Sequence, residues 1–269
     1  MRMKTFVILP LLAVTSAVYA QKSGDWRPAT LPPVVFGKNI DAALYNLKNA
    51  WGRGLYRSEG KIGRGTAVLE MRVRNRSVFN IELVRNNPKA TDPFQSQTLI
   101  GNKGKFYLLS KEKGFQKLAA GSDPGFGSSQ GMVKAWPLHL QQLVWQSYVT
   151  GKGVFGPLMQ GLVRGDGGYT IRMDQRTLQA EGRSYPQMRI FASRKPALVK
   201  KLGESSIEIV VDSRMWLPLQ IRVIERLPNQ QKSLYEWTTS WKGPQVFEDK
   251  FFATPTYQKI TIPTKTATH

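Results

Sequence analysis

The stretch VVDSRMWLPLQIRV, residues 210–223, consists of two alternating segments separated by a turn. With Ile207 and Ile209 just before the stretch included, the apolar positions are Ile207, Ile209 and Val211 before the turn and Leu219, Ile221 and Val223 after it. Alternation with a period of two places these side chains on one face of a strand pair, so the stretch predicts a β-hairpin with a dry face and a wet face. We expect Pro218 to lead the second strand into an edge position and Trp216 to pack over the rim of the sheet.

The same alternation recurs in both directions along the chain. Further hairpin or strand patterns cover residues 67–85, 105–118, 169–193 and 234–241. The apolar positions of the first of these are Leu69, Met71, Val73, Phe79, Ile81 and Leu83. Consecutive hairpins with one apolar face predict a single antiparallel meander that curls around an apolar interior. The expected fold class is α+β, an incomplete antiparallel β-barrel, or half-barrel meander, with helices covering its apolar concave face.

Two segments have helical spacing instead. In residues 39–54 the spacing of Leu44, Leu47 and Trp51 predicts an opening helix. Asn39 or Asp41 is the candidate N-cap, and Gly52 and Gly54 are the expected stop signals. Residues 135–163 predict one or two helices inserted into the meander, after a loop that is flexible by composition. We expect this insertion to cover the concave face as a lid, with candidate residues Leu140, Leu143, Val144 and Tyr148.

The N-terminal segment resembles a secretory signal. Arg2 and Lys4 precede a short apolar run that ends at Ala20, which predicts a cleavable signal peptide over residues 1–20. Gln21 stands where a lipid-anchored protein would need cysteine, and the chain has no cysteine, which excludes disulfides and thiolate chemistry. We expect an extended leader over 21–38, one domain over 39–255 and a tail over 256–269. The expected location is the periplasm, without a lipid anchor.

The formal net charge is +21. Export argues against nucleic acid as the partner and favours anionic lipid head groups or acidic envelope polymers. A solvated cationic surface without a specific ligand is the alternative, and the even spread of basic residues along the chain favours it.

The sequence carries no pattern of catalytic or metal-ligating residues. The only histidines are His139 and His269, and the acidic residues are scattered, with Glu248 and Asp249 adjacent. We therefore expect no enzyme, no metal and no cofactor. A hydrolase whose two carboxylates are brought together by the fold stays open, because acid and nucleophile need not be neighbours in sequence.

The chain also resembles the periplasmic outer-membrane lipoprotein-carrier family, which includes LolA-like carriers and the N-terminal domain of RseB-like regulators. The resemblance rests on an apolar strand ending in Asp, a Leu-Pro step, a second strand and a closing Phe before a Pro: Ile209–Asp212, Leu217-Pro218, Leu219–Val223, and Phe251 or Phe252 with Pro255. It spans roughly residues 39–255. The arginine that holds the lid shut in the family's carriers has no clear counterpart here.

The resemblance implies an apolar cavity that takes the acyl chains of lipids or lipoproteins. We expect the protein to be a monomer. The candidate lining of the cavity is the apolar strand set named above, Leu69, Met71, Val73, Phe79, Ile81, Leu83, Ile209, Val211, Leu219, Ile221 and Val223; the alternative is that these residues are simply a filled core. A second functional hypothesis is an envelope-stress sensor or regulator that docks on a membrane protein.

Overall fold

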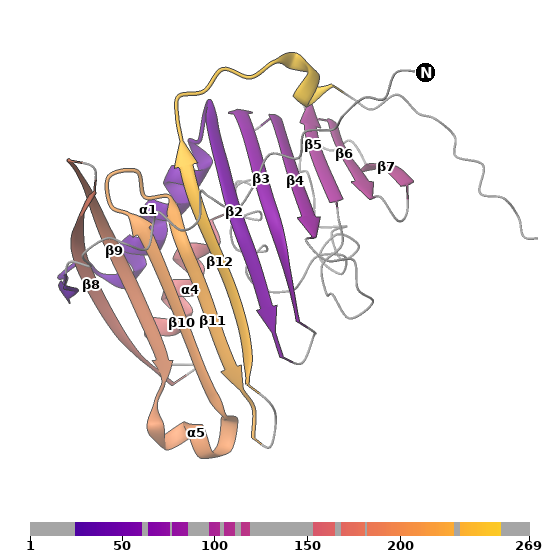
Figure 1. Ribbon diagram of the computed structural model, residues 1–269. Coiled ribbons are helices and arrows are strands. Elements are labelled where there is room, and N and C mark those ends of the chain that lie inside the picture. The colour runs from indigo at the N-terminus through magenta and orange to yellow at the C-terminus, as the bar shows by residue number, and fades with distance from the viewer. Residues whose placement is uncertain are drawn as a thin grey trace, which may run out of the picture.

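The computed structural model describes residues 25–60, 64–75, 77–85, 97–102, 105–110, 114–118, 153–164, 168–180, 182–228 and 232–253 (Figure 1). Twelve strands form one antiparallel sheet that is open, with β1 and β7 as its edges. The strands are β1 (Arg27–Pro28), β2 (Ala50–Glu59), β3 (Gly65–Asn75), β4 (Val78–Arg85), β5 (Gln97–Asn102), β6 (Lys105–Ser110), β7 (Gly114–Leu118), β8 (Tyr169–Ala180), β9 (Arg183–Arg194), β10 (Glu204–Asp212), β11 (Pro218–Arg226) and β12 (Ser233–Lys242). The predicted fold class, an open antiparallel half-barrel with helices, is confirmed.

The strand order is β1-β8-β9-β10-β11-β12-β2-β3-β4-β5-β6-β7. Strands β2–β7 form one meander and β8–β12 another, as the alternating segments predict. The two meanders join where β12 pairs with β2, in a register that runs from Leu234 opposite Glu59 to Lys242 opposite Trp51. This pairing is not a hairpin, and the local patterns did not identify it.

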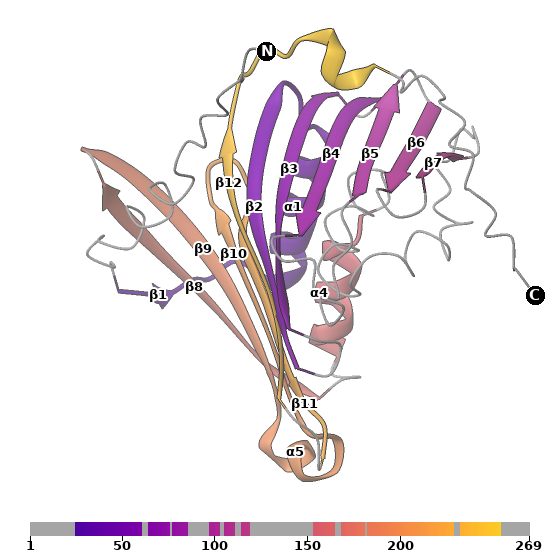
Figure 2. The same ribbon diagram turned by 45° about the vertical axis from the view of Figure 1, so that its right-hand side comes forward.

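Two helices lie on the same face of the sheet (Figure 2). They are α1 (Pro33–Tyr45) and α4 (Phe155–Arg164), and they pack against each other. A third helix, α5 (Pro196–Leu202), connects β9 to β10 at one end of the sheet, and a short 3-10 helix, η2 (Asp249–Phe252), follows β12. Because α4 falls inside the segment predicted as a helical insertion, this part of that prediction is confirmed.

The predicted opening helix is misplaced by several residues. Helix α1 begins at Pro33, inside the segment expected to be an extended leader, and it ends at Tyr45. Pro33 lies in the first turn of the helix, where its missing N–H would have no partner within the helix. A proline at this position indicates the start of a helix, and the sequence prediction did not use it. Leu47 follows the helix and Trp51 lies in β2, so their apparent helical spacing with Leu44 is coincidental.

Gly52 and Gly54 do not stop a helix but lie inside β2. A Cβ on Gly54 would lie 2.6 Å from Trp237 Nε1, and one on Gly52 would lie 2.9 Å from the Trp241 ring. The two glycines are therefore explained by the tryptophans of the neighbouring strand β12, which pack directly over the backbone of β2.

The turn at residues 212–217 is built around Asp212. Its Oδ1 accepts hydrogen bonds from the backbone N–H groups of Arg214 (2.8 Å) and Met215 (3.1 Å). Trp216 adopts a left-handed backbone (φ 57°), and its ring meets that of Phe36 in α1 edge to face at 6.0 Å. The prediction that Trp216 packs at the end of the sheet is thereby confirmed.

The edge position expected for Pro218 is wrong, because β11 pairs on both sides, with β10 and β12. Pro218 is the first residue of β11, a place where the lack of an N–H is tolerated, and its carbonyl accepts a bond from Trp241 Nε1 (2.7 Å).

Several predictions fall outside the described residues: the signal peptide, the tail beyond 253, Pro255, both histidines and the lid candidates Leu140, Leu143, Val144 and Tyr148. Among the helices that are described, none is long and apolar enough to cross a membrane.

Candidate functional site

The covered face of the sheet is apolar across both meanders. Ten of the eleven predicted lining residues are buried there, at no more than 7% exposure, and they belong to one cluster: Leu69, Met71, Val73, Phe79, Ile81, Leu83, Ile209, Val211, Ile221 and Val223. The structure therefore brings together residues from β3, β4, β10 and β11 as the alternation predicts.

Leu219 is the exception. The register shifts between Val210, which faces Gln220, and Val211, which faces Pro218, so Leu219 is the extra residue of a β-bulge. It is partly buried and is not a member of the core cluster formed by the described residues. The bulge removes Leu219 from the series of buried side chains, while Ile221 and Val223 keep the predicted face. Nothing in the alternation of residues 217–223 reveals it.

The helices supply the other wall of this interior. Phe36, Ile40 and Leu44 of α1, and Phe155, Met159 and Leu162 of α4, are buried in the same cluster. Sequence reasoning missed Phe36 and Ile40 because they lie in or next to the expected leader. Their spacing of four, just after the Pro32-Pro33 step, is the signal that identifies them.

The two helices are joined by a carboxylate. Asp41 of α1 accepts hydrogen bonds from the first backbone N–H groups of α4: Oδ1 from Val154 (2.9 Å) and Phe155 (3.0 Å), and Oδ2 from Gly156 (2.8 Å). The orphan donors of a helix N-terminus are thus capped by a residue more than a hundred positions away. Gly37 allows the close approach, since a Cβ there would lie 2.5 Å from the Phe155 carbonyl oxygen. The arrangement makes α1 and α4 one unit over the sheet.

A small polar spot interrupts the apolar wall at the junction of the two meanders. Trp237 is 0% exposed, stacks on Tyr56 with ring centroids 6.1 Å apart, and its Nε1 has no hydrogen-bond partner within the described structure. Thr239 Oγ1, two residues along β12, is likewise buried and unbonded among these residues. A Cβ on Gly54 would lie within 3 Å of both atoms, so the two donors flank one point of β2. Buried donors without partners are uncommon in native proteins.

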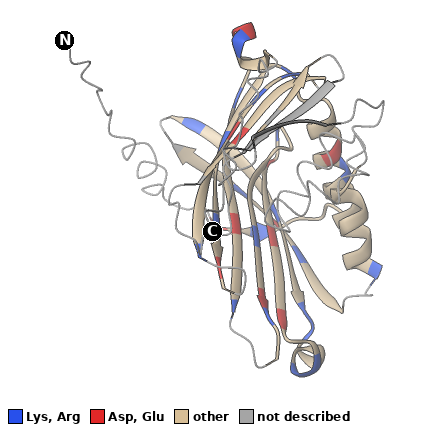
Figure 3. Ribbon diagram, turned by 90° about the vertical axis from the view of Figure 1, so that its right-hand side faces the viewer, with Lys and Arg blue, Asp and Glu red and all other residues tan. Residues whose placement is uncertain are grey.

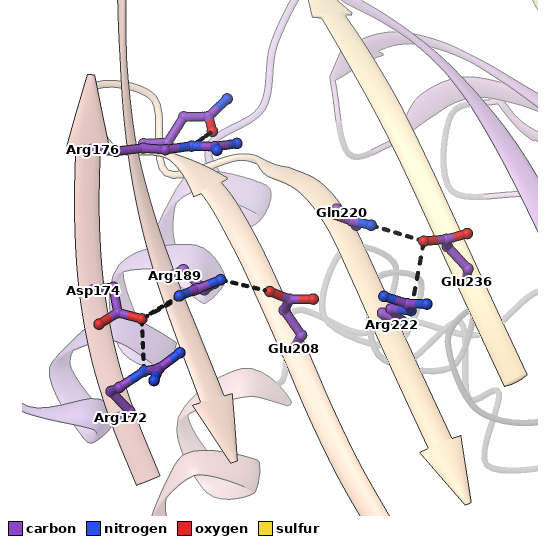
Figure 4. Close-up of polar contacts among 9 residues, drawn as sticks. Arg172, Asp174, Arg176, Arg189, Glu208, Gln220, Arg222 and Glu236 are labelled. Carbon is purple, nitrogen blue, oxygen red and sulfur yellow. Dashed lines mark hydrogen bonds and ion pairs between the residues drawn. The ribbon is translucent and has the colours of Figure 1, made fainter. Parts of the chain in front are cut away.

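The opposite, outer face of the sheet carries a ladder of charges (Figure 4). Asp174 Oδ2 accepts bonds from Arg189 (2.5 Å) and Arg172 (3.0 Å), and Arg189 also donates to Glu208 (3.2 Å). Two strands further on, Glu236 accepts a bond from Gln220 (2.8 Å) and lies 3.9 Å from Arg222. Many of the arginines that raise the net charge are therefore used within the sheet itself.

Trp26 closes the β1 end of this face. The guanidinium groups of Arg176 and Arg189 each lie 4.2 Å from the centre of its ring. Burial lowers the pKa of Arg176, and the neighbouring charge of Arg189 lowers it further. The contact fastens the segment before α1 to β8 and β9.

The closing aromatic motif fastens the other end of the chain. Asn80 and Asn102 donate to the carbonyl oxygens of Phe251 (2.8 Å) and Phe252 (3.0 Å), and Arg74 donates to that of Phe247 (2.8 Å). Arg72 and Arg74 lie over the Phe251 and Phe252 rings, at 4.5 Å and 4.7 Å. The segment 246–253 is thereby held against β3, β4 and β5.

Two pairs of carboxylates among the described residues lie close together, one across the sheet and one in sequence. They contain no group of three or more His, Asp or Glu side chains placed to hold a metal. Glu70 and Glu82 face each other across β3 and β4, but both are bound by Arg72, at 2.8 Å and 3.4 Å, and Trp51 Nε1 donates to Glu70 (2.8 Å). Glu248 pairs with Lys250, and Asp249 with Arg74. These carboxylates belong to surface ion pairs.

No protein-family model and no curated protein matches the chain. Among solved structures it is similar to MucB from Pseudomonas aeruginosa in complex with MucA, at 12% identity and a TM-score of 0.41, over 83% of this chain and 62% of that chain. The chain thus spans about three fifths of the length of MucB.

Two other similar structures match over nearly their whole length. One is a LolA superfamily protein from Nitrosomonas europaea (8% identity, TM-score 0.33, covering 84% of this chain and 99% of that chain), and the other is LprF from Mycobacterium bovis (9%, 0.39, 81% and 99%). The solved structures that the chain is similar to thus include a LolA superfamily protein and MucB.

Proposed function

We propose that the protein is an exported, non-catalytic carrier that binds the acyl chains of lipids or lipoproteins between its sheet and the α1–α4 pair. The observation that carries the proposal is the continuous apolar face, which spans both meanders and is covered by helices rather than by a second sheet. Because each buried methylene contributes about 0.8 kcal/mol, one acyl chain in such an interior is held reversibly but usefully.

The polar spot supports an acylated ligand over a plain hydrocarbon. Trp237 Nε1 and Thr239 Oγ1 are donors in an apolar wall, and an ester, amide or carboxylate oxygen at the head of an acyl chain would satisfy them. In this proposal the chain's tail lies along the strands and its carbonyl end lies near Gly54.

The first test is native mass spectrometry of the protein purified after export, without detergent, followed by organic extraction. A copurifying acylated species is the expected result. If no ligand copurifies and the protein does not bind fluorescent fatty-acid probes, the carrier proposal is wrong. Copurification of an envelope protein without lipid would instead favour a regulator that docks on a membrane protein.

The second test separates binding from folding. Thr239→Val keeps the shape of the side chain and removes its hydroxyl, so the free energy of unfolding is expected to stay the same or to rise. Affinity for a fatty-acid probe is expected to fall about fivefold, as for one lost hydrogen bond. The control is Thr238→Val, on the neighbouring position and opposite face of β12, which is expected to leave probe binding unchanged. Equal probe affinity in both variants would exclude Thr239 from the site.

A further inference from the structure

One end of the sheet is formed by α5 and two turns, and we call it the α5 end (Figures 1 and 2). It comprises residues 195–203, the β11–β12 turn at 226–228 and 232, and the β2–β3 turn at 60 and 64. These parts are in contact: a Cβ on Gly203 would overlap the Arg226 carbonyl, and one on Gly60 would lie 2.9 Å from the Lys232 carbonyl oxygen. The α5 end is therefore one surface made from three separate stretches of sequence.

Helix α5 is held in place by its backbone. Lys195 N donates to the Gly168 carbonyl (2.6 Å), and Arg194 Nη1 donates to the carbonyls of Leu202 (2.5 Å) and Gly203 (2.7 Å). None of its residues is buried. Leu198 lies against Gly168, whereas Lys200, Lys201 and Leu202 are exposed on this fixed scaffold.

The outward side chains are rich in lysine. Lys195, Lys200, Lys201 and Lys232 are exposed, and none of the four forms an ion pair with another described residue. Arg64 and Arg226 have only long contacts, at 3.8 Å, with Glu59 and Glu204. Helix α5 itself contains no acidic residue (Figure 3). The α5 end is consequently cationic even after its own carboxylates, Glu59, Glu204 and Glu225, are counted.

Exposed leucines lie beside these lysines. Leu202 at the end of α5 is 42% exposed, and Leu227 after β11 is 45% exposed. Gly203 brings them close, because its position lies against the backbone of Leu227. Exposed lysines beside exposed leucines are typical of surfaces that bind anionic bilayers, because the lysines contact the head groups and the leucines enter the interface.

We propose that the α5 end docks the protein on an anionic lipid bilayer. The described residues of the α5 end include exposed lysines and no exposed aromatic residue, which favours a bilayer over a protein partner, because protein interfaces are depleted of lysine and enriched in tyrosine, tryptophan and arginine. The exposed residues of the α5 end are Arg64, Lys195, Pro196, Ala197, Lys200, Lys201, Leu202, Arg226, Leu227, Pro228 and Lys232. This proposal does not depend on what, if anything, the apolar interior binds.

The test is co-sedimentation of the exported protein with vesicles of phosphatidylcholine, with and without phosphatidylglycerol. Binding is expected only with phosphatidylglycerol and is expected to weaken as salt is added, since salt screens surface charge. Each lysine near such a surface contributes about fivefold to affinity, so K195Q/K200Q/K201Q is expected to bind about 100-fold more weakly. Leu202→Ser with Leu227→Ser is expected to abolish the binding that survives at high salt.

The matched control is K48Q/K242Q/K250Q, which removes the same charge at the opposite end of the sheet. Lys48 precedes β2, Lys242 ends β12 and Lys250 lies in η2, and all three are exposed. If both triple variants lose the same amount of vesicle affinity, only the net charge matters and the proposal is wrong. Equal binding of the unaltered protein to vesicles with and without phosphatidylglycerol would also overturn it. Fatty-acid probe binding, measured in parallel without vesicles, is expected to be the same in all variants. A failure of the docking proposal can therefore be told apart from a failure of the carrier proposal.

Discussion

Trp216 combines a backbone strain with a packing gain. Its left-handed φ of 57° costs a non-glycine residue about 1 kcal/mol, and its ring packs on Phe36 of α1. Trp216→Ala loses the packing and keeps the strain, so we expect the free energy of unfolding to fall by about 3 kcal/mol. Trp216→Gly loses the packing and relieves the strain, and it is expected to be about 1 kcal/mol more stable than the alanine variant.

Urea unfolding of the two variants measures both differences. The glycine variant being the less stable would show that the backbone strain is not real. A Trp216→Ala protein with unchanged stability but lost affinity for fatty-acid probes would show instead that Trp216 acts on ligand rather than on packing.

Asp41 is the residue on which the α1–α4 unit depends. Three N–H groups of α4 lose their acceptor in Asp41→Ala, so we expect the loss of a strong helix cap, about 2 kcal/mol. Amide hydrogen exchange is expected to rise within residues 154–164 more than in the strands. Glu248→Ala, which removes only a surface ion pair, is the control and is expected to leave both quantities nearly unchanged.

At the scale of elements, two glycines give opposite predictions. Gly54 in β2 lies beneath Trp237 and Thr239, so Gly54→Ala overpacks the seam and is expected to destabilise the protein by about 2 kcal/mol. Gly161 in α4 has open space where its Cβ would be, and Gly161→Ala is expected to stabilise the protein by about 1 kcal/mol through helix propensity. Thermal unfolding of the pair checks both signs, and a stabilising Gly54→Ala would contradict the packing of β12 on β2.

The C-terminal segment 246–253 depends on Arg74. This residue bonds the Phe247 carbonyl, pairs with Asp249 and lies over the Phe252 ring. Arg74→Gln is expected to raise hydrogen exchange at residues 247–252 while the strands keep their protection. Arg57→Gln, which breaks only an exposed contact with Glu59, is the control. Unchanged hydrogen exchange in the Arg74 variant would mean that the bonds from Asn80 and Asn102 alone hold this segment in place.

The elements that the sequence predicts well are those whose pattern is local. Residues 207–223 form the expected hairpin because the alternate side chains other than Leu219 meet the same interior, and the same holds for Leu69–Val73 with Phe79–Leu83. The predicted position of the opening helix is wrong because Leu47 lies after α1 and packs in the core, and Trp51 lies in β2, where its Nε1 donates to Glu70. The bulge at Leu219 depends on the register with β10, and the cap of α4 depends on Asp41; neither contact is visible in a local window.

At the scale of the whole molecule, the carrier proposal predicts that ligand and stability are linked. A ligand that binds only the folded protein raises the free energy of unfolding by about 2.7 kcal/mol when its free concentration is 100 times its Kd. We expect a fatty-acid probe to raise the thermal midpoint in proportion to the logarithm of its concentration, and Thr239→Val to shift that curve to higher concentrations. A thermal midpoint that does not change with probe concentration would mean that the interior is a filled core.

The pairing of β12 with β2 has a consequence for how the protein reaches its native state. The hydroxyl of Ser240 contacts the Arg53 carbonyl across 187 positions of sequence, so this seam is the slowest kind of contact to form. A chain that emerges from its N-terminus presents β2 long before β12 exists. Until then one edge of β2 has no partner strand, and an open edge beside an apolar surface favours aggregation. Losing β12 would therefore separate the two meanders rather than shorten one.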